Sequence, residues 1–258
     1  MKTKTSLLGA WPIVLLILAL MALPVSADET NSDANFSGPE WSLVDLQKVQ
    51  AAAAEITPQK YPEDDSATVE RKSVRNYRAD GTGECQDESF TKVLTEKGKR
   101  ENREMAFGFM LPYWTIDITK VEVLKPDGTR VPVDVAANSK ESIDDSQMSM
   151  NIYDPNERVL RLNIPQLEIG DTVHLVARQI IHRSIMPDEY DEGNVFEGTS
   201  FIRHISYEVH APTALPLTRI GLRAEVPGTI SYSAETNSDT AVYHWDISNV
   251  PRMYDEPD

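Results

Sequence analysis

The sequence predicts an all-β protein, an antiparallel β-sandwich with a short N-terminal helix. Segments in which apolar and polar residues alternate recur along the chain, and a period of two is typical of strands with one buried face. Turn-forming pairs such as Asp80-Gly81, Asp127-Gly128 and Pro227-Gly228 separate these segments. Many short strands at this spacing, with no helical period after the first short helix, favour a sandwich.

The composition is that of a globular protein with enough length for one core or two small ones. Of its 258 residues, 40% are hydrophobic and 26% are charged. The formal net charge is −16. Because this charge repels phosphate backbones, we expect no nucleic-acid partner. A partner held by charge should be a cation or a basic protein segment.

Residues 1–27 have the features of a secretory signal peptide. Lys2 and Lys4 precede an apolar run at 12–23, and the small residues of Val25-Ser26-Ala27 form a cleavage site. The alternative is an uncleaved membrane anchor, for which the apolar run is short and interrupted by proline. We therefore expect an exported protein, periplasmic or extracellular, with no stable membrane insertion after cleavage.

The rest of the chain divides into two parts. Residues 28–62 are predicted to form a polar linker and a short helix, and residues 63–258 the β-sandwich domain. The helix should begin near Ser42, which resembles a capping box together with Asp45, and should end before Pro58.

The expected strands are grouped into hairpins by the turns between them. They are a first hairpin at 67–80 and 84–94, a strand at 105–109, a second hairpin at 114–123 and 131–135, a third at 157–183, and short strands at 201–209, 220–224, 230–232 and 242–245. A turn is expected at 96–99, and surface loops are expected at 136–147 and 186–194.

The hairpin at 157–183 is predicted to lie in the middle of the fold. Apolar residues alternate with polar ones in both arms: Leu160, Leu162 and Ile164 in the first, and Val173, Leu175 and Ala177 in the second. A proline and a Gly-Asp pair between the arms would reverse the chain. Since an isolated hairpin is marginally stable, other strands must cover its apolar face.

Short motifs in this region resemble those of a known family. They are Arg161-Leu162, Ile164-Pro165, Leu167-Glu168 and the run 169–173, preceded by Asp80-Gly81, the run 92–98 and Lys125-Pro126-Asp127-Gly128. In order and spacing they resemble the exported bacterial β-sandwich domain of unknown function that precedes transglutaminase-like cysteine peptidase domains. The likeness spans about residues 67–258 and includes none of the peptidase's own Cys, His and Asp motifs. It implies a partner, a transglutaminase-like domain or another exported protein.

Cys85 is the only cysteine, so the chain forms no internal disulfide. A catalytic thiol needs a histidine base and a positive environment that lowers its pKa. Cys85 instead follows a turn on a predicted strand, between Glu84 and Asp87, and negative neighbours raise a thiol pKa. We therefore interpret it as structural.

The histidines show no metal-binding spacing. His174, His182, His204 and His210 have the parity opposite to their apolar neighbours, which predicts an outer-face position; His244 is the fifth histidine.

The loop at 186–194 holds four carboxylates, those of Asp188, Glu189, Asp191 and Glu192, on either side of Tyr190. Calcium would suit these oxygen ligands, but their order does not match an EF-hand, so a solvated loop is favoured and the calcium question stays open.

Aromatic residues offer a second alternative. Tyr113 and Trp114, near Phe107 and Phe109, would form a sugar-binding platform if they were exposed. The alternation through Trp114 instead points its side chain inward, which favours core packing.

The resulting hypothesis is an exported, non-catalytic module that binds or docks onto a transglutaminase-like peptidase domain absent from this chain. It predicts no catalytic, cofactor-binding or metal-ligating residue and no cofactor. The alternatives are an autonomous cysteine- or carboxylate-based hydrolase and a carbohydrate-binding module. Fold class alone does not distinguish them.

Overall fold

The structure, a computed structural model, describes residues 43–146, 148, 153–186, 189–218, 220–221 and 226–254. The predicted signal peptide and residues 28–42 lie outside this part of the chain. Within it, none of the helices has the length and apolar character needed to cross a membrane.

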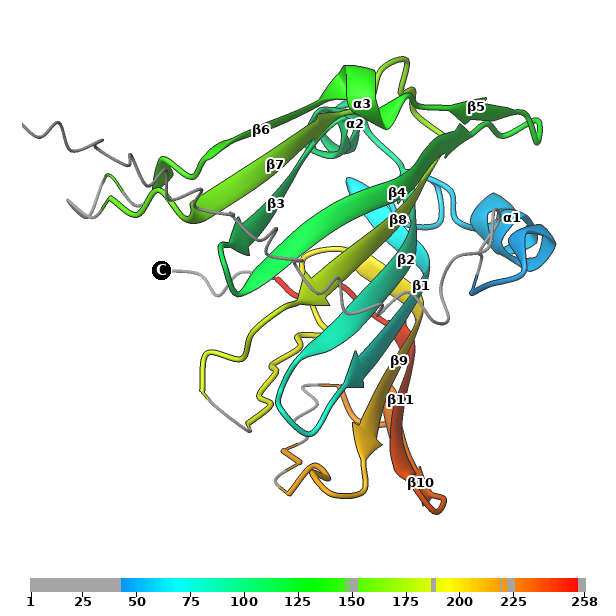
Figure 1. The fold of residues 1–258 in the computed structure, drawn as a ribbon. Helices are drawn as coiled ribbons and strands as arrows, with labels where there is room; N and C mark the ends of the chain where they lie inside the picture. The colour runs from blue at the N-terminus through cyan, green and yellow to red at the C-terminus, as the bar shows by residue number, and fades with distance from the viewer. Residues whose placement is uncertain are drawn as a thin grey trace, which may run out of the picture. The chain divides into compact units, whose positions relative to one another are not determined.

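The elements follow one another along the chain, and most of them are strands (Figure 1). They are α1 (Leu46–Glu55), β1 (Ser66–Tyr77), β2 (Gly83–Val93), α2 (Glu96–Arg103), β3 (Glu104–Met110), β4 (Trp114–Leu124), β5 (Arg130–Pro132), α3 (Val135–Asn138), β6 (Ser139–Ile143), β7 (Glu157–Asn163), β8 (Thr172–Ile181), β9 (Phe201–Pro212), β10 (Ile230–Thr236) and β11 (Thr240–Val250).

The described strands form two sheets. The larger has eight strands in the order β10-β11-β9-β1-β2-β8-β4-β5, and the smaller has three in the order β3-β7-β6. All pairs are antiparallel except β1 with β9, which are parallel. The predicted all-β class with a short N-terminal helix is confirmed, although this parallel pair makes the large sheet mixed.

The two sheets share a hydrophobic core, which makes the arrangement sandwich-like. Leu162 of β7 and Ile164 just after it pack with Val123 of β4 and with Val173 and Leu175 of β8. The smaller sheet therefore covers one face of the β2-β8-β4 part of the large sheet. Two further clusters lie around β9 and β11 and beneath α1.

The first and second predicted hairpins are confirmed, as β1 with β2 and β4 with β5. The predicted hairpin at 157–183 is wrong. Its first arm, β7, pairs with β3 and β6, whereas its second arm, β8, lies between β2 and β4. The apolar faces of the two arms meet across the core instead of lying side by side.

The connection between β7 and β8 carries the chain from one sheet to the other, and internal contacts fix it. The buried Asp171 carboxylate accepts the Glu168 backbone N–H at 2.7 Å and pairs with Lys125 Nζ at 2.7 Å. Leu167 is buried in the shared core.

Helix α1 lies within the predicted segment and packs on the large sheet, but it begins at Leu46 with Asp45 as its N-cap, not near Ser42. The Asp45 side chain caps it by accepting the N–H groups of Gln47 and Lys48. Its alanine-rich face packs on Phe90 of β2 and Leu124 of β4. This helix therefore covers part of the sheet face opposite to the smaller sheet.

Two segments that were expected to lack regular structure contain helices or a strand. The predicted turn at 96–99 begins α2, which the Thr95 side chain caps at the Gly98 N–H. The predicted loop at 136–147 contains most of α3 and all of β6. Conversely, Ile220 lies outside any strand, and residues 222–225 of that predicted strand are not among the described residues.

Replacing Leu162 with alanine should lower the free energy of unfolding by about 2–5 kcal/mol, because it opens a cavity in the core that the two sheets share. The side chain is fully buried. Asn163→Ala, an exposed position on the same strand, should change stability by about 0.5 kcal/mol or less. Urea denaturation measures both, and equal small losses would contradict the packing of β7 on the large sheet.

Candidate functional site

A cavity of about 550 Å³ lies beside strands β9 and β11. Tyr207 of β9 and Trp245 of β11 line it on the sheet side, and residues 190–197, a loop without regular structure, line it elsewhere. Cavities of this size accommodate small ligands or a few side chains. It is therefore the first candidate for a binding site.

Contacts with the β1–β2 turn hold the loop in place. Gly81 has φ +78°, and a Cβ on it would lie 2.7 Å from the Glu189 carbonyl oxygen. Only glycine therefore fits both the left-handed conformation and the close approach. The Tyr190 ring stacks on Tyr77 of β1 at 4.0 Å between centroids.

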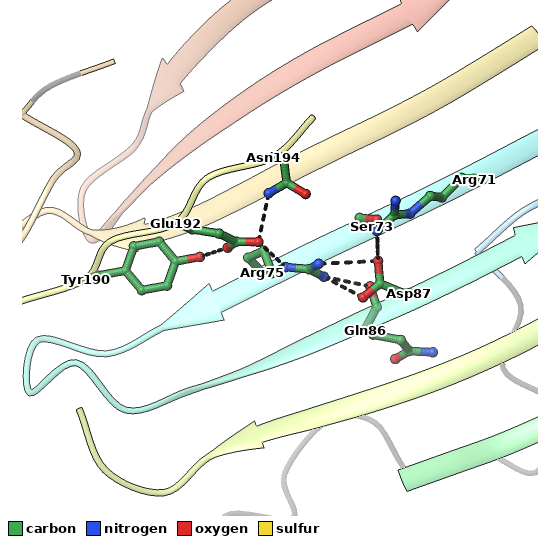
Figure 2. Close-up of polar contacts among 8 residues, drawn as sticks. All are labelled: Arg71, Ser73, Arg75, Gln86, Asp87, Tyr190, Glu192 and Asn194. Atoms are coloured by element: carbon green, nitrogen blue, oxygen red, sulfur yellow. Dashed lines mark hydrogen bonds and ion pairs between the residues drawn. The ribbon is translucent and has the colours of Figure 1, made fainter. Parts of the chain in front are cut away.

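An ion-pair network around the buried Arg75 connects the loop to the sheet (Figure 2). Arg75 of β1 lies between Glu192 of the loop, 3.0 Å from its Nε, and Asp87 of β2, 3.0 Å from its Nη1. The Arg75 guanidinium also lies 5.4 Å from the centre of the Tyr207 ring. A buried cation is stable only when it is paired in this way.

Each carboxylate of the network accepts further hydrogen bonds. Glu192 accepts the hydroxyl of Tyr190 and the Asn194 amide, the latter at 2.9 Å. Asp87 accepts the Ser73 hydroxyl and pairs with Arg71 at 3.0 Å.

These contacts move the pKa values of the groups away from neutrality. Burial raises the pKa of Asp87 and of Glu192, but Arg75 outweighs it and holds both below their usual range. Burial raises the pKa of Tyr190 and Tyr207, and the Glu192 carboxylate adds to the effect. Burial also raises the pKa of the Cys85 thiol to about 12.

The acidic loop is only partly a solvated loop. Glu189 and Asp191 are exposed, but Glu192 turns inward to Arg75. Asp188 is not among the described residues. Within the described ranges, no group of three or more His, Cys, Asp or Glu side chains is placed to hold a metal ion.

The outer-face prediction is wrong for His174, which is fully buried. Its ring lies between Glu122, at 2.6 Å from Nδ1, and Glu88, at 2.8 Å from Nε2, and stacks on Phe90. As its parity predicts, His174 lies on the sheet face opposite to the apolar residues of its strand. That face is covered at this point by the segment before α1, whose Leu43 backbone N–H donates to Glu88 at 2.6 Å. Burial lowers the pKa of His174, but the two carboxylates outweigh it and raise the pKa.

The other histidines are more accessible than His174. His182 is exposed and His204, His210 and His244 are half-buried. The His204 ring contacts Glu70 and, at 2.8 Å, Asp246. The hydrogen bond with Glu70 raises the pKa of His204 to about 9.

The four aromatic residues considered for a sugar-binding platform do not share one exposed face. Phe109 is buried and Phe107 packs against the core that the two sheets share. Trp114 and Tyr113 are half-buried, and the Arg183 guanidinium lies 5.8 Å from the centre of the Tyr113 ring.

Sequence reasoning did not identify Arg75 or Tyr207 as site residues. Both lie on long strands, where a charged or aromatic residue is common. Glu192, the partner of Arg75 in the loop, is 117 residues away along the chain. One sequence feature did indicate that Arg75 is buried, because it lies two residues before the buried Tyr77 and therefore on the same face of the strand.

The fold and site define a mostly-β, sandwich-like module with a lined cavity. The chain belongs to the family described as "Domain of Unknown Function with solved-structure structure (DUF3857)", whose model matches residues 79–254. No curated protein matches the chain.

Among solved structures, the chain is similar to a protein described as a "putative protease" from Parabacteroides distasonis ATCC 8503. The TM-score is 0.62 at 15% identity, and the match covers 74% of this chain and 37% of that one. The chain thus spans little more than a third of that protein, and the likeness shows the fold.

Two weaker matches carry no argument because their TM-scores are low. One is a carbohydrate-binding module of a Clostridium thermocellum scaffoldin, at TM-score 0.28 and 8% identity, covering 52% of this chain and 80% of that one. The other is yeast LTA4 hydrolase, at TM-score 0.28 and 10% identity, covering 88% of this chain and 33% of that one.

Replacing Arg75 with methionine should lower the free energy of unfolding at neutral pH by about 2–3 kcal/mol, because the half-buried carboxylates of Asp87 and Glu192 lose a charged partner while Arg71 still pairs with Asp87. In the wild type the lowered pKa of each carboxyl contributes stability above about pH 4, which is lost as pH falls through the folded pKa. In the Arg75→Met variant, protonation of the two carboxylates at lower pH removes the negative charge that Arg75 no longer balances. The deficit measured by urea denaturation should therefore shrink from pH 7 to pH 4.

Arg71→Met is the matched control. Arg71 also pairs with Asp87, but its side chain is 35% exposed, so its loss should cost about 1 kcal/mol or less. A deficit for Arg75→Met that is the same at both pH values would contradict the network.

Stability should fall as pH rises through the range in which His204 loses its proton. A raised folded pKa means that the contribution is complete below the unfolded value of about 6.5 and is lost as pH passes about 9. Urea denaturation at pH 6, 7.5 and 9 should show a smaller slope for His204→Gln than for the wild type. His182→Gln, an exposed position, serves as the control, and an unchanged slope for His204→Gln would be the contrary result.

Proposed function

We propose that this chain is an exported, non-catalytic module that docks onto a transglutaminase-like peptidase domain. The observation that carries the proposal is the set of pKa shifts around the cavity. Acid–base catalysis at neutral pH needs a group whose pKa lies near 7. Around this cavity the carboxyls of Asp87 and Glu192 are shifted down and the hydroxyls and thiol are shifted up, so each group keeps one protonation state.

The surroundings of Cys85 support the same proposal. Its side chain is buried, and with a pKa of about 12 the thiol stays protonated and a poor nucleophile. Arg75 lies near it and favours the thiolate, but burial and the carboxylates of Glu192 and Asp87 outweigh that effect. A fixed charge pattern beside a thiol that stays protonated suits recognition better than turnover.

The similarity to part of a longer protein also supports docking. The matched protein is described as a "putative protease", and the fold seen here accounts for 37% of it. A module of this kind would work beside a catalytic domain, and the resemblance to the domain that precedes transglutaminase-like peptidases gives the partner class. The signal-peptide pattern of residues 1–27 supports export.

The test of docking is complex formation between the purified protein and a transglutaminase-like domain encoded by the same genome. Analytical ultracentrifugation should show a complex, and an unrelated exported domain of similar size should remain separate. Absence of a complex at high micromolar concentrations would overturn the docking proposal.

The test of the non-catalytic character is a peptidase and transglutaminase assay on the protein and on Cys85→Ala. We expect no turnover in either, and a loss of stability of about 1 kcal/mol in the variant, because a small buried side chain is shortened. Turnover abolished by Cys85→Ala would establish the hydrolase alternative, and turnover that survives it would point to the carboxylates.

A further inference from the structure

The charged residues among the described lining of the cavity are acidic. Its charged lining residues are Asp191, Glu192 and Glu197, and no lysine, arginine or histidine is among the described residues that line it. Glu192 is balanced by Arg75 from outside the lining, whereas Asp191 is exposed to solvent. The chain as a whole carries a net charge of −16. The exposed Asp191 carboxylate and the net charge of the chain therefore favour a cationic occupant.

The remaining walls and the mouth are apolar. The Phe196 and Trp245 rings each lie 5.6 Å from Tyr207, edge-on to it, which forms an aromatic wall. Val195 and Met253 line the cavity and are 82% and 39% exposed. Exposed apolar groups beside a polar cavity are a feature of protein-binding surfaces.

Tyr207 provides an independent sign of a ligand. Its side chain lines the cavity and is 4% exposed. The Glu192 carboxylate lies close enough to raise the pKa of the hydroxyl, yet none of the described residues, Glu192 included, forms a hydrogen bond of ordinary geometry with it. A buried polar group without a partner costs free energy. Because its pKa is raised by burial and by Glu192, the hydroxyl is neutral and has a proton to donate.

We infer that this cavity binds a basic side chain, lysine or arginine, carried on an apolar-flanked peptide segment of the docking partner. The cation would contact Asp191 and the aromatic wall, where cation–π attraction contributes. The flanking apolar residues would cover the exposed mouth, and a polar group of the segment would pair with Tyr207. This inference rests on the proposed docking function and names the part of the partner that is recognised.

The probe is a synthetic peptide, acetyl-Ala-Leu-Lys-Leu-Ala-amide, titrated into the full chain by calorimetry at low salt. Two matched peptides carry norleucine or glutamate in place of lysine. We expect the lysine peptide to bind most tightly, norleucine about threefold to fivefold more weakly, and glutamate not measurably. Equal affinities for lysine and norleucine would overturn the proposal, and so would binding of a soluble oligosaccharide at this cavity in place of the peptide.

Variants that remove one negative charge test whether the peptide binds in this cavity. Asp191→Asn should weaken the lysine peptide about threefold to fivefold and leave the norleucine peptide unchanged. Asp117→Asn removes the same charge from an exposed position on β4, on the far side of β1, β2 and β8 from the cavity, and should have no effect. Equal effects of the two variants would show that the peptide is attracted by the net charge of the protein and not by this cavity, which would overturn the proposed site.

Tyr207→Phe separates a binding role from a structural one. Removing a buried hydroxyl that lacks a well-formed hydrogen bond should leave the melting temperature unchanged or raise it, while peptide affinity falls about fivefold. A lower melting temperature with unchanged affinity would show that the hydroxyl is structural.

The two proposals fail in distinguishable ways. A complex with the transglutaminase-like domain that is insensitive to Asp191→Asn and Tyr207→Phe would overturn this inference and leave docking intact. Peptide binding without such a complex would overturn docking to that partner.

Discussion

The ion pairs of Arg75 are the constraint on which the candidate site depends. The guanidinium connects β1 to Asp87 of β2 and to Glu192 in the loop that lines the cavity. Because a buried charge must remain paired, that loop cannot move away without removing one of the two carboxylate partners of Arg75. An electrostatic contact therefore fixes a cavity wall in a segment without regular secondary structure.

Much of the fold could be predicted from sequence where the information is local. The Asp80-Gly81 turn joins two strands that do pair, and α1 ends before Pro58 as expected, although Asp45 and not Ser42 is its N-cap. The alternation at 157–183 correctly marked buried residues such as Leu162 and Leu175. It did not reveal that the two arms face each other across the core, since a period of two defines a face and not a hydrogen-bonded neighbour. The parallel pairing of β1 with β9 is equally non-local.

The candidate site could be predicted far less well, because its pairs join distant residues. His174 illustrates the difficulty: its parity placed it correctly on the second face, but Glu88 and Glu122, 86 and 52 residues away, make that position buried and charged. Cys85 was a simpler case. Its acidic neighbours already indicated a raised pKa, and the structure adds burial as the larger cause. Local electrostatics can be read from sequence, whereas burial requires the fold.

Strand β9 explains how one sheet supports both an open polar face and a lined cavity. His204 and Glu208 lie on one side of the strand, and Tyr207 lies on the other. The cavity side is completed by loops that tyrosines hold: the Tyr77 hydroxyl donates to the Leu215 carbonyl at 2.8 Å, and the Tyr243 hydroxyl accepts the Leu217 N–H at 3.1 Å. A rigid sheet side and tethered loops give a preformed cavity. Binding then requires little ordering of the protein, so its contacts contribute more fully to affinity.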